Sequence, residues 1–327
     1  MMQAFCPSAG LGTRLTPLTR YRAKPLLPVL GIPVFLKVLD TLRSSGVRRV
    51  VANRHHLPTG FDTFLPPHPL GLDLLYSDEQ LLLDTGGGLA EVMRSQDLGE
   101  TFFYHNADII LETNLKAALA SHLKGPQIAT LLVDGAKGKR NVPMAEDRRI
   151  LGFRERIDGI RSVTWCGVGI LSQRVRDFFP RKRSFCVLDA LVEAIRAGEL
   201  VLGFPLHPGD YWCDIGTVPM YSEVQSHAAQ GLFSMPVDCG AREIRNHLWA
   251  GHGATVPPDT QVRGYAAVGS QTVLKTQVLL ENTIVWDACT VAPGVSLRDC
   301  IVTDRTRVDQ DCQNGIVSRD GITFIRP

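Results

Sequence analysis

The sequence predicts an α/β fold with a mostly parallel sheet, followed by a short parallel β-helix. From residue 2 to about residue 230, short apolar segments alternate with segments of helical periodicity, a pattern typical of parallel sheets covered by helices on both faces. After about residue 234 the helical periodicity stops, and aliphatic residues recur every six positions. A chain of 327 residues is long enough for two domains. We therefore expect domains at 1–234 and 235–327.

The α/β region alternates its elements in a regular order. The expected strands are 3–9, 47–53, 101–110, 127–134, 150–156 and 163–172, each a short apolar run. The expected helices are 33–46, 114–125 and 187–198, and 212–231 runs from a strand end into a helix. Asn114 is a suitable N-cap, because its side chain can accept a hydrogen bond from a backbone N–H that the helix leaves unpaired. Ligands of such folds collect at the carboxyl ends of strands.

The C-terminal region carries a six-residue repeat. The repeated positions are Ile244, Ala250, Val256, Val262, Val268, Leu274, Leu280, Trp286 and Ala292. A second series, from Thr260 to Ser296, holds mostly small or β-branched residues. One inward side chain for every short face suits a triangular parallel β-helix with a stacked interior. A repeat of about three turns needs a cap or a packed neighbour to be stable.

Composition and cysteine usage restrict the class of protein. The formal net charge of +2 gives no sign of a nucleic-acid or membrane partner, and 44% of the residues are hydrophobic. The eight cysteines contain no CxxC pair, and no Cys/His cluster has zinc spacing. The N-terminus lacks the features of a signal peptide, and no apolar run approaches the length of a bilayer span. We expect a cytoplasmic protein with reduced, mostly buried cysteines.

A glycine turn follows the first predicted strand, in the string "AGLGTRLTPLTRYRAKPLLPV". Gly10 and Gly12 have no Cβ, so backbone N–H groups of this turn can approach a phosphate. The dinucleotide-binding fingerprint would need a third glycine where Leu15 stands, and the Gly-Lys-Ser/Thr of a Walker loop is absent. A plain turn between a strand and a helix remains the simpler alternative for the two glycines alone.

Two cations accompany the glycine turn. Arg14 offers a planar fork of donors for phosphate oxygens, whereas Lys24 carries a compact charge on a flexible stem. Pro25 disfavours the helical conformation for the residue before it, so we expect Lys24 to be extended. Together with the glycine turn, these side chains predict a site for phosphate groups.

The whole string resembles the signature of the sugar-1-phosphate nucleotidyltransferases. In that family the pattern is close to G-x-G-T-R-L-x-P-L-T, then P-K-P-L, then P-V; Ala23 stands where the family often has proline. Later segments are similar to further family motifs in family order: "LLLDTGGGL" (81–89), "HNADII" (105–110), "GFRER" (152–156), "WCGVGIL" (165–171) and "WCDIGT" (212–217). The resemblance implies a Rossmann-like, GT-A-like nucleotidyltransferase domain and a left-handed β-helix.

The resemblance also implies a role for each motif residue. Nucleotide binding falls to Gly10, Leu11, Gly12, Thr13, Gly86 and Gly87. The sugar phosphate falls to Glu155, Arg156 and Gly167, and Mg²⁺ to Asp108 and Asp214. The catalytic residues are Arg14, Lys24 and Asp108. An aspartate at a strand end also commonly caps a helix, and glycines at 86–88 can simply shape a turn before the helix that follows them. Arg156 stands where the family usually has lysine.

The implied reaction is transfer of a nucleoside monophosphate from a nucleoside triphosphate to a hexose 1-phosphate. We expect GTP with mannose 1-phosphate before UTP, although base and sugar stay open. Positioning and electrostatics carry such a reaction, and no side-chain nucleophile is needed. Arg156 leaves a second hypothesis, a regulatory homologue that binds nucleotide sugar. A third makes the β-helix an acyltransferase, with His247 and His252 near its first coils. We expect a homo-oligomer, with the β-helix as one candidate contact surface.

Overall fold

The computed structural model describes residues 1–236 and 240–324, and its contacts divide the chain into two compact units. The first, here called the sheet unit, contains Met1–Leu11 and Val38–Asp214. The second, the coil unit, contains Gly12–Lys37 and Ile215–Pro327. The segment with Arg14 and Lys24 is therefore grouped with the C-terminal repeat, 180 residues or more along the chain. The functional division at residue 234 stays a prediction.

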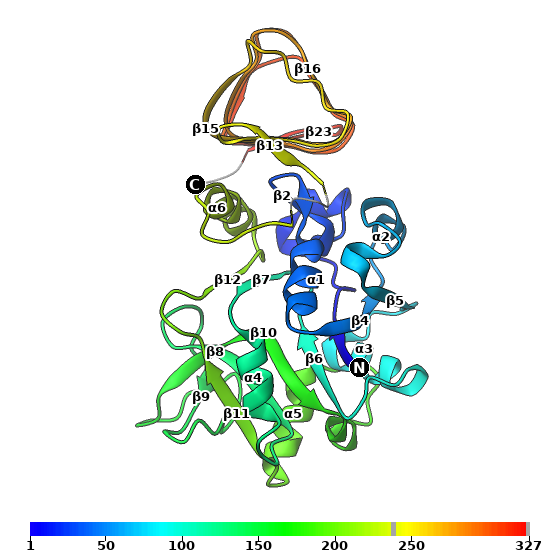
Figure 1. Ribbon diagram of the computed structural model, residues 1–327, viewed down its shortest axis with the longest axis vertical. Helices are drawn as coiled ribbons and strands as arrows, with labels where there is room; N and C mark the ends of the chain where they lie inside the picture. The colour runs from blue at the N-terminus through cyan, green and yellow to red at the C-terminus, as the bar shows by residue number, and fades with distance from the viewer. Residues whose placement is uncertain (237–239, 325–327) are drawn as a thin grey trace. The chain divides into compact units, whose positions relative to one another are not determined.

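The sheet unit is built on one mixed, mostly parallel sheet (Figure 1). In spatial order its strands are β11 (Val201–Pro205), β8 (Ala129–Asp134), β10 (Ser162–Ser172), β6 (Thr101–His105), β1 (Met2–Cys6), β4 (Val47–Arg54) and β5 (Asp73–Asp78), and β9 (Val142–Pro143) pairs with β10. Strand β10 runs antiparallel to β6, β8 and β9, whereas the other pairs are parallel. The predicted mostly parallel sheet is confirmed.

Helices bury apolar side chains against this sheet. They are α2 (Thr59–Phe64), α3 (Asp84–Ser95), α4 (Leu115–His122) and α5 (Val187–Arg196), with α1 (Val34–Ser44) crossing the boundary between the units. Phe5, Tyr104 and Leu131 from the strands and Leu191 from α5 belong to one buried cluster. Asn114 caps α4 as predicted, since its Oδ1 accepts from the Ala117 N–H at 3.2 Å.

Two strand predictions, and the alternative reading of glycines 86–88 as a turn, were wrong. The expected strand 101–110 ends at His105, and after a turn β7 (Ile109–Glu112) pairs antiparallel with β12 (Tyr211–Asp214) in a separate sheet. Residues 150–156 are not a strand, because only Ile150 among them makes an isolated bridge and the side chains of residues 154–156 are exposed. The glycines at 86–88 lie inside α3 instead of forming a turn before it.

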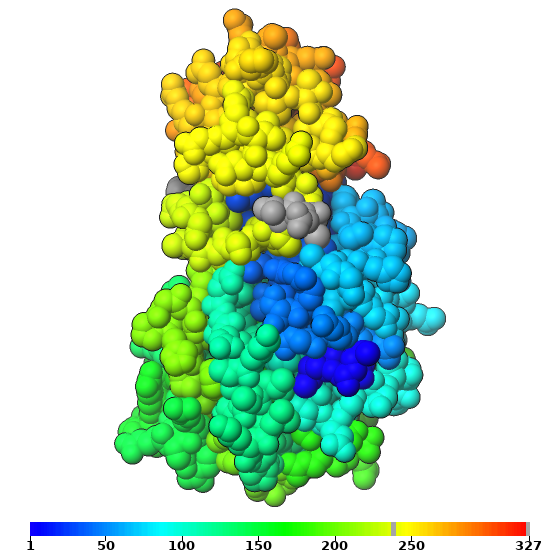
Figure 2. Space-filling view, in the orientation of Figure 1, coloured from blue at the N-terminus to red at the C-terminus, as the bar shows by residue number. Residues whose placement is uncertain are grey.

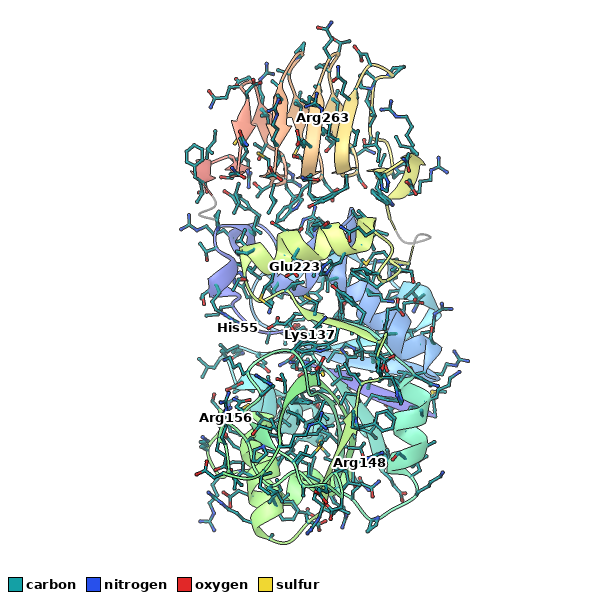
Figure 3. All side chains as sticks on the ribbon, turned by 90° about the vertical axis from the view of Figure 1, so that its left-hand side faces the viewer. His55, Lys137, Arg148, Arg156, Glu223 and Arg263 are labelled. Carbon is teal, nitrogen blue, oxygen red and sulfur yellow. The ribbon has the colours of Figure 1, made fainter. Side chains whose placement is uncertain are left out.

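The coil unit contains parallel strands wound with a triangular cross-section (Figure 1). One sheet pairs, in this order, β14 (Leu248–Ala250), β15 (Gln261–Val268), β17 (Leu279–Val285), β20 (Ile301–Val302) and β23 (Gly315–Ser318). In the same sheet β19 (Ser296–Arg298) pairs with β17, and β22 (Cys312–Gln313) pairs with β19. Another stacks β16 (Val273–Leu274), β18 (Thr290–Val291) and β21 (Arg307–Val308). Figure 3 shows the strands lying side by side, with Arg263 on their outer face.

Antiparallel strands finish both ends of this stack. At the start, β13 (Arg242–Arg245) pairs antiparallel with β14. At the end, β24 (Gly321–Phe324) pairs antiparallel with β23. Each of these two terminal strands therefore runs opposite to the parallel strands that lie between them.

The interior of the coil departs from the strict six-residue repeat. Val268, Leu274 and Leu280 are buried in its core at six-residue spacing, as predicted, but the next inward residue is Val285. Val268 pairs with Val285 and Val285 with Val302, so these coils take 17 residues each. The inward assignment of Trp286 was therefore wrong: the residue is buried, but outside the core cluster. Ala292 packs only at the edge of that cluster, and Ile244 is exposed.

The coil unit also holds α6 (Val218–Ala229) and the short hairpin β2 (Pro28–Val29) and β3 (Ile32–Pro33). The Tyr265 hydroxyl of β15 donates to the Ser222 carbonyl of α6 at 3.4 Å. Figure 2 shows atoms of α6, in yellow-green, directly below the first coils, in yellow. The repeat thus has the packed neighbour that its short length requires.

Two of the general predictions concern cysteines and membrane segments. The seven cysteines among the described residues form no disulfide, and Cys239 lies outside the described residues. Five of the seven are buried, as expected. Within residues 1–236 and 240–324, no helix combines the length and apolar character of a transmembrane span.

Candidate active site

The glycine turn is folded back onto the residues that precede Lys24. Gly12 has a left-handed backbone, with φ +61° and ψ +33°. A Cβ on Gly12 would lie 2.7 Å from Thr19 Cγ2 and 3.3 Å from Lys24 Cβ. The Thr19 hydroxyl donates to the Gly12 carbonyl at 3.0 Å. Both the conformation and the close approach require glycine here, and the lysine stem is held beside the turn.

The turn has an exposed side and a buried apolar side. The exposed residues are Gly10, Leu11, Thr13 and Arg14, and buried leucines follow them in the chain. The 3₁₀ helix Thr13–Leu15 buries Leu15, and the next one, Leu18–Arg20, buries Leu18. Buried leucines anchor the segment, so the Arg14 guanidinium remains accessible to a ligand in solvent.

Lys24 begins a third short 3₁₀ helix, Lys24–Leu26. The extended conformation expected for this residue was therefore wrong. The backbone N–H of Leu27 donates to the Lys24 carbonyl at 3.2 Å, closing the turn. Pro25 and Leu26 are buried while Lys24 is half-buried. Its stem starts from a fixed point because of this turn and the contact with Gly12.

The two predicted metal carboxylates lie at neighbouring ends of β7 and β12 in the sheet unit. Asp214 is the last residue of β12, and its register partner on β7 is Ile109. Asp108 directly precedes Ile109 and belongs to the turn after β6. Both aspartates are partly exposed. Antiparallel pairing thus brings together two carboxylates more than 100 residues apart in the sequence.

The turn before Asp108 is fixed by contacts from β10 and from Pro7, the residue after β1. The Asn106 N–H donates to the Gly167 carbonyl of β10 at 3.0 Å, and the Ala107 N–H donates to the Pro7 carbonyl at 3.2 Å. Gly167 has φ +76°, and a Cβ there would lie 2.8 Å from Asn106 Nδ2. Gly167 is therefore required for close packing against the "HNAD" turn.

This donor set fits Mg²⁺ shared with a substrate. Among the described residues, no group of three or more His, Cys, Asp or Glu side chains is arranged to hold a metal ion. Mg²⁺ is usually bound by one or two carboxylates together with substrate phosphates and water. The pair Asp108 and Asp214 meets that requirement, whereas a closed protein cage would need more ligands.

The predicted nucleotide-binding glycines Gly86 and Gly87 are buried in the first turn of α3. Their backbone N–H groups donate to the Phe185 carbonyl at 2.8 and 3.0 Å. A Cβ on Gly86 would lie 2.5 Å from the Phe185 ring, and one on Gly87 would lie 2.5 Å from the Arg183 carbonyl. Packing of α3 against residues 183–186 explains both glycines, and their contact with a nucleotide stays a prediction.

The predicted sugar-phosphate residues Glu155 and Arg156 lie on an exposed loop between β9 and β10. The Glu155 N–H donates to the Asn141 carbonyl at 3.1 Å, which ties the loop to residue 141. Arg156 donates to the Lys139 carbonyl at 3.5 Å, and Figure 3 shows it at the margin of the sheet unit. The structure therefore joins neither residue to Gly167 by a hydrogen bond that would fix a sugar site.

A buried polar chain escaped the sequence analysis. The Ser8 N–H donates to Asn53 Oδ1 at 2.7 Å, and Asn53 Nδ2 donates to Glu79 Oε1 at 2.6 Å. Glu79 Oε2 accepts from the Leu83 N–H at 3.1 Å, just before α3. Burial raises the pKa of Glu79, against the opposite effect of these two hydrogen bonds. These hydrogen bonds connect the end of β1, at the glycine turn, to the start of α3. In the sequence, the signal for them was a polar residue, Asn53, at the end of a predicted strand.

Nearby, Asp134 fixes the strand that carries Asp214. The Trp212 indole N–H of β12 donates to Asp134 Oδ2 at 2.6 Å. Burial favours a higher pKa for Asp134, but hydrogen bonds from the N–H groups of Lys137 and Ala136 and from Trp212 outweigh it and lower this pKa. The carboxylate therefore stays ionised and orients the strand two residues before Asp214.

The sheet, the glycine turn and the paired carboxylates define a nucleotidyltransferase. The chain belongs to the nucleotidyl transferase family, whose model matches residues 8–231. It is similar to the mannose-1-phosphate guanylyltransferase of Mycobacterium tuberculosis, with 26% identity over 93% of this chain and 80% of that protein. The similarity to the probable mannose-1-phosphate guanylyltransferase 3 of Oryza sativa is 32% identity, over 94% of this chain and 82% of the relative.

Solved structures show the same fold. A putative glucose-1-phosphate thymidylyltransferase from Bacillus anthracis aligns with a TM-score of 0.62 and 16% identity, over 72% of this chain and 98% of the other. The UDP-glucose pyrophosphorylase from Acinetobacter baumannii also aligns with a TM-score of 0.62 and 13% identity, over 71% of this chain and 94% of the other. The family match and the curated relatives confirm the resemblance to sugar-1-phosphate nucleotidyltransferases found in the sequence.

Proposed function

We propose that this protein transfers a nucleoside monophosphate from a nucleoside triphosphate to a hexose 1-phosphate, with release of pyrophosphate. The observation that carries the proposal is the left-handed Gly12 packed beside Lys24, within the segment that the family signature covers. Relatives aligned over most of the chain are guanylyl- and uridylyltransferases for hexose 1-phosphates. We propose GTP and mannose 1-phosphate as the preferred pair because several of these relatives carry that name.

In the proposed reaction a phosphate oxygen of the sugar 1-phosphate attacks the α-phosphorus of the triphosphate. The bond from that phosphorus to the bridging oxygen of the β-phosphate breaks, and pyrophosphate leaves with its electron pair. Arg14 binds the β- and γ-phosphates through its fork of donors. Lys24 neutralises charge that would repel the attacking anion. The backbone N–H groups at Gly10–Thr13 accommodate the triphosphate because the glycines leave room for it.

Asp108 and Asp214 would hold Mg²⁺, which neutralises phosphate charge and orients the reacting groups when it is bound. We assign the sugar phosphate to Glu155, Arg156 and Gly167, and nucleoside contacts to Gly86 and Gly87. For the C-terminal region we propose a left-handed parallel β-helix, in agreement with the parallel pairing and the triangular section. We also propose a cytoplasmic homo-oligomer without a nucleic-acid partner.

The test measures pyrophosphate release with each of GTP, UTP, ATP and dTTP, combined with mannose, glucose and N-acetylglucosamine 1-phosphates. We expect turnover that depends on Mg²⁺ and is fastest with GTP and mannose 1-phosphate. Turnover fastest with another pair corrects the substrate assignment. If no pair turns over while nucleotide sugar binds tightly, the regulatory alternative suggested by Arg156 replaces the enzyme.

A further inference from the structure

Arg22 is a buried cation that stands between Arg14 and Lys24 in the sequence, two residues before Lys24. Its side chain is 2% exposed. Its Nε donates to Asp304 Oδ2 at 2.8 Å, and its Nη2 donates to Asp287 Oδ2 at 2.7 Å and also to Asp304 Oδ1. The guanidinium carbon lies 5.1 Å from the centre of the Trp286 ring. All these partners belong to the coil, more than 260 residues further along the chain.

Asp287 and Asp304 occupy equivalent positions on neighbouring coils. Each lies two residues after a register partner, Val285 or Val302, and the Asp287 N–H donates to Asp304 Oδ1 at 3.1 Å. Parallel strands stack about 4.8 Å apart, so two ionised carboxylates in this arrangement repel each other. The Arg22 fork pairs with both and offsets that repulsion, in a geometry that a point charge cannot reproduce.

The ionic state of Arg22 agrees with this geometry. Burial alone would lower the pKa of Arg22, but the hydrogen bonds and charges of Asp304 and Asp287 outweigh it and raise this pKa. Removal of both carboxylate charges would therefore deprive a buried cation of two charge partners, which is costly.

Neighbouring residues attach the same segment to the rest of the coil unit. The Tyr21 hydroxyl donates to Asp320 Oδ2 at 2.6 Å. Further along, Gln225 of α6 accepts from the Leu30 N–H at 2.8 Å and donates to the Pro28 carbonyl at 2.8 Å. The segment from Gly12 to Leu30 is thus fixed by the coil in its middle and by α6 at its end.

We propose that Arg22 is a positioning residue through which the coil holds the Gly12–Lys24 segment in its active conformation. The coil then serves the transfer reaction itself, by fixing where the stems of Arg14 and Lys24 begin. This inference rests on the proposed function for its kinetic consequence, whereas its structural part is tested separately. Arg22 touches no substrate in this proposal and acts through Lys24.

The decisive variant is Asp287→Asn/Asp304→Asn, which keeps the side-chain shapes and removes both charges far from the segment in sequence. The matched control is Asp299→Asn/Asp311→Asn, which changes two exposed aspartates of the same β-helix. Asp299 accepts a hydrogen bond from the Asn282 side chain and Asp311 accepts one from the Ser296 N–H, and neither bonds to Arg22. Both double variants change the net charge equally. We measure amide hydrogen exchange over residues 12–27 and steady-state kinetics.

In the Asp287/Asp304 variant we expect amide exchange in 12–27 to accelerate at least tenfold and kcat to fall at least tenfold, with neither change in the control. Arg22→Lys should retain more kcat than Arg22→Ala. Unchanged exchange in 12–27 overturns the inference, and so does faster exchange with an unchanged kcat. If the wild type turns over no substrate pair, the proposed function fails, and the exchange measurement alone decides whether Arg22 holds the segment.

Discussion

Gly12 lies directly against the Cβ of Lys24, in a left-handed conformation that only glycine adopts without strain. The contact makes the glycine turn and the lysine one structural unit. Substitution of Gly12 should therefore affect both the stability of the segment and the position of the Lys24 stem.

Gly12→Ala is expected to destabilise the protein by roughly 1–3 kcal/mol, since φ is +61° and the new methyl would lie 2.7 Å from Thr19 Cγ2. Chemical unfolding measures this change. Gly10→Ala is the matched control for stability, because a Cβ at Gly10 meets no atom within 4 Å. Equal stability of the two variants would contradict the strain assigned to Gly12.

Lys24→Ala should lower kcat at least a hundredfold while the melting temperature stays near that of the wild type. The reason is loss of a cation beside two anionic reactants, from a position that is only half-buried. Lys116→Ala, on the exposed face of α4, serves as the control for loss of a surface lysine. Near-normal turnover in Lys24→Ala would remove Lys24 from the catalytic residues.

Asp108→Asn and Asp214→Asn should each raise the Mg²⁺ concentration for half-maximal rate at least tenfold. An amide oxygen is a weaker ligand than a carboxylate for this hard cation, and the pair is the expected protein contribution to the site. Titration of the rate with Mg²⁺ at fixed substrate measures the shift, with the exposed Glu100→Gln as control. An unchanged Mg²⁺ requirement in both aspartate variants would refute this metal site.

Because His122 is buried, we expect the protein to lose stability in acid. Burial lowers the pKa of His122 to about 4, well below the ordinary value near 6.5. Between those values the unfolded chain binds a proton that the folded protein does not, so stability falls as the pH drops from about 6.5 towards 4. At pH 5 this amounts to roughly 2 kcal/mol. In His122→Gln the difference in unfolding free energy between pH 7 and pH 5 should shrink by that amount; the same difference as in the wild type would show that another group is responsible.

Local patterns predicted the local elements, but contacts between distant segments could not be read from them. Asn114 capped α4 as expected, because capping depends on neighbours in the chain. The strand expected at 101–110 was broken at Asn106, since Gly167 of β10 and Pro7, the residue after β1, bind that turn. The six-residue repeat changed at Val285, where a coil of 17 residues replaced one of 18.

The candidate site shows the same limit. The family signature identified Gly12 and Lys24, and the structure added the contact between them. Arg22 stands in the same quoted string, yet no neighbour in the sequence marks it as buried, because its partners Asp287 and Asp304 lie in the distant repeat. Asn53 and Glu79 were missed for the same reason.

The reversed strands β13 and β24 have a consequence for self-association. A stack of parallel coils could in principle grow without limit, one copy adding to the end of the next, because each open edge repeats the strand pattern inside. Here the strands that run from β14 to β23 are bounded at both ends by strands of opposite direction, so an incoming coil finds no parallel edge to extend at those positions. Along that part of the stack, end-to-end growth by parallel pairing is therefore blocked.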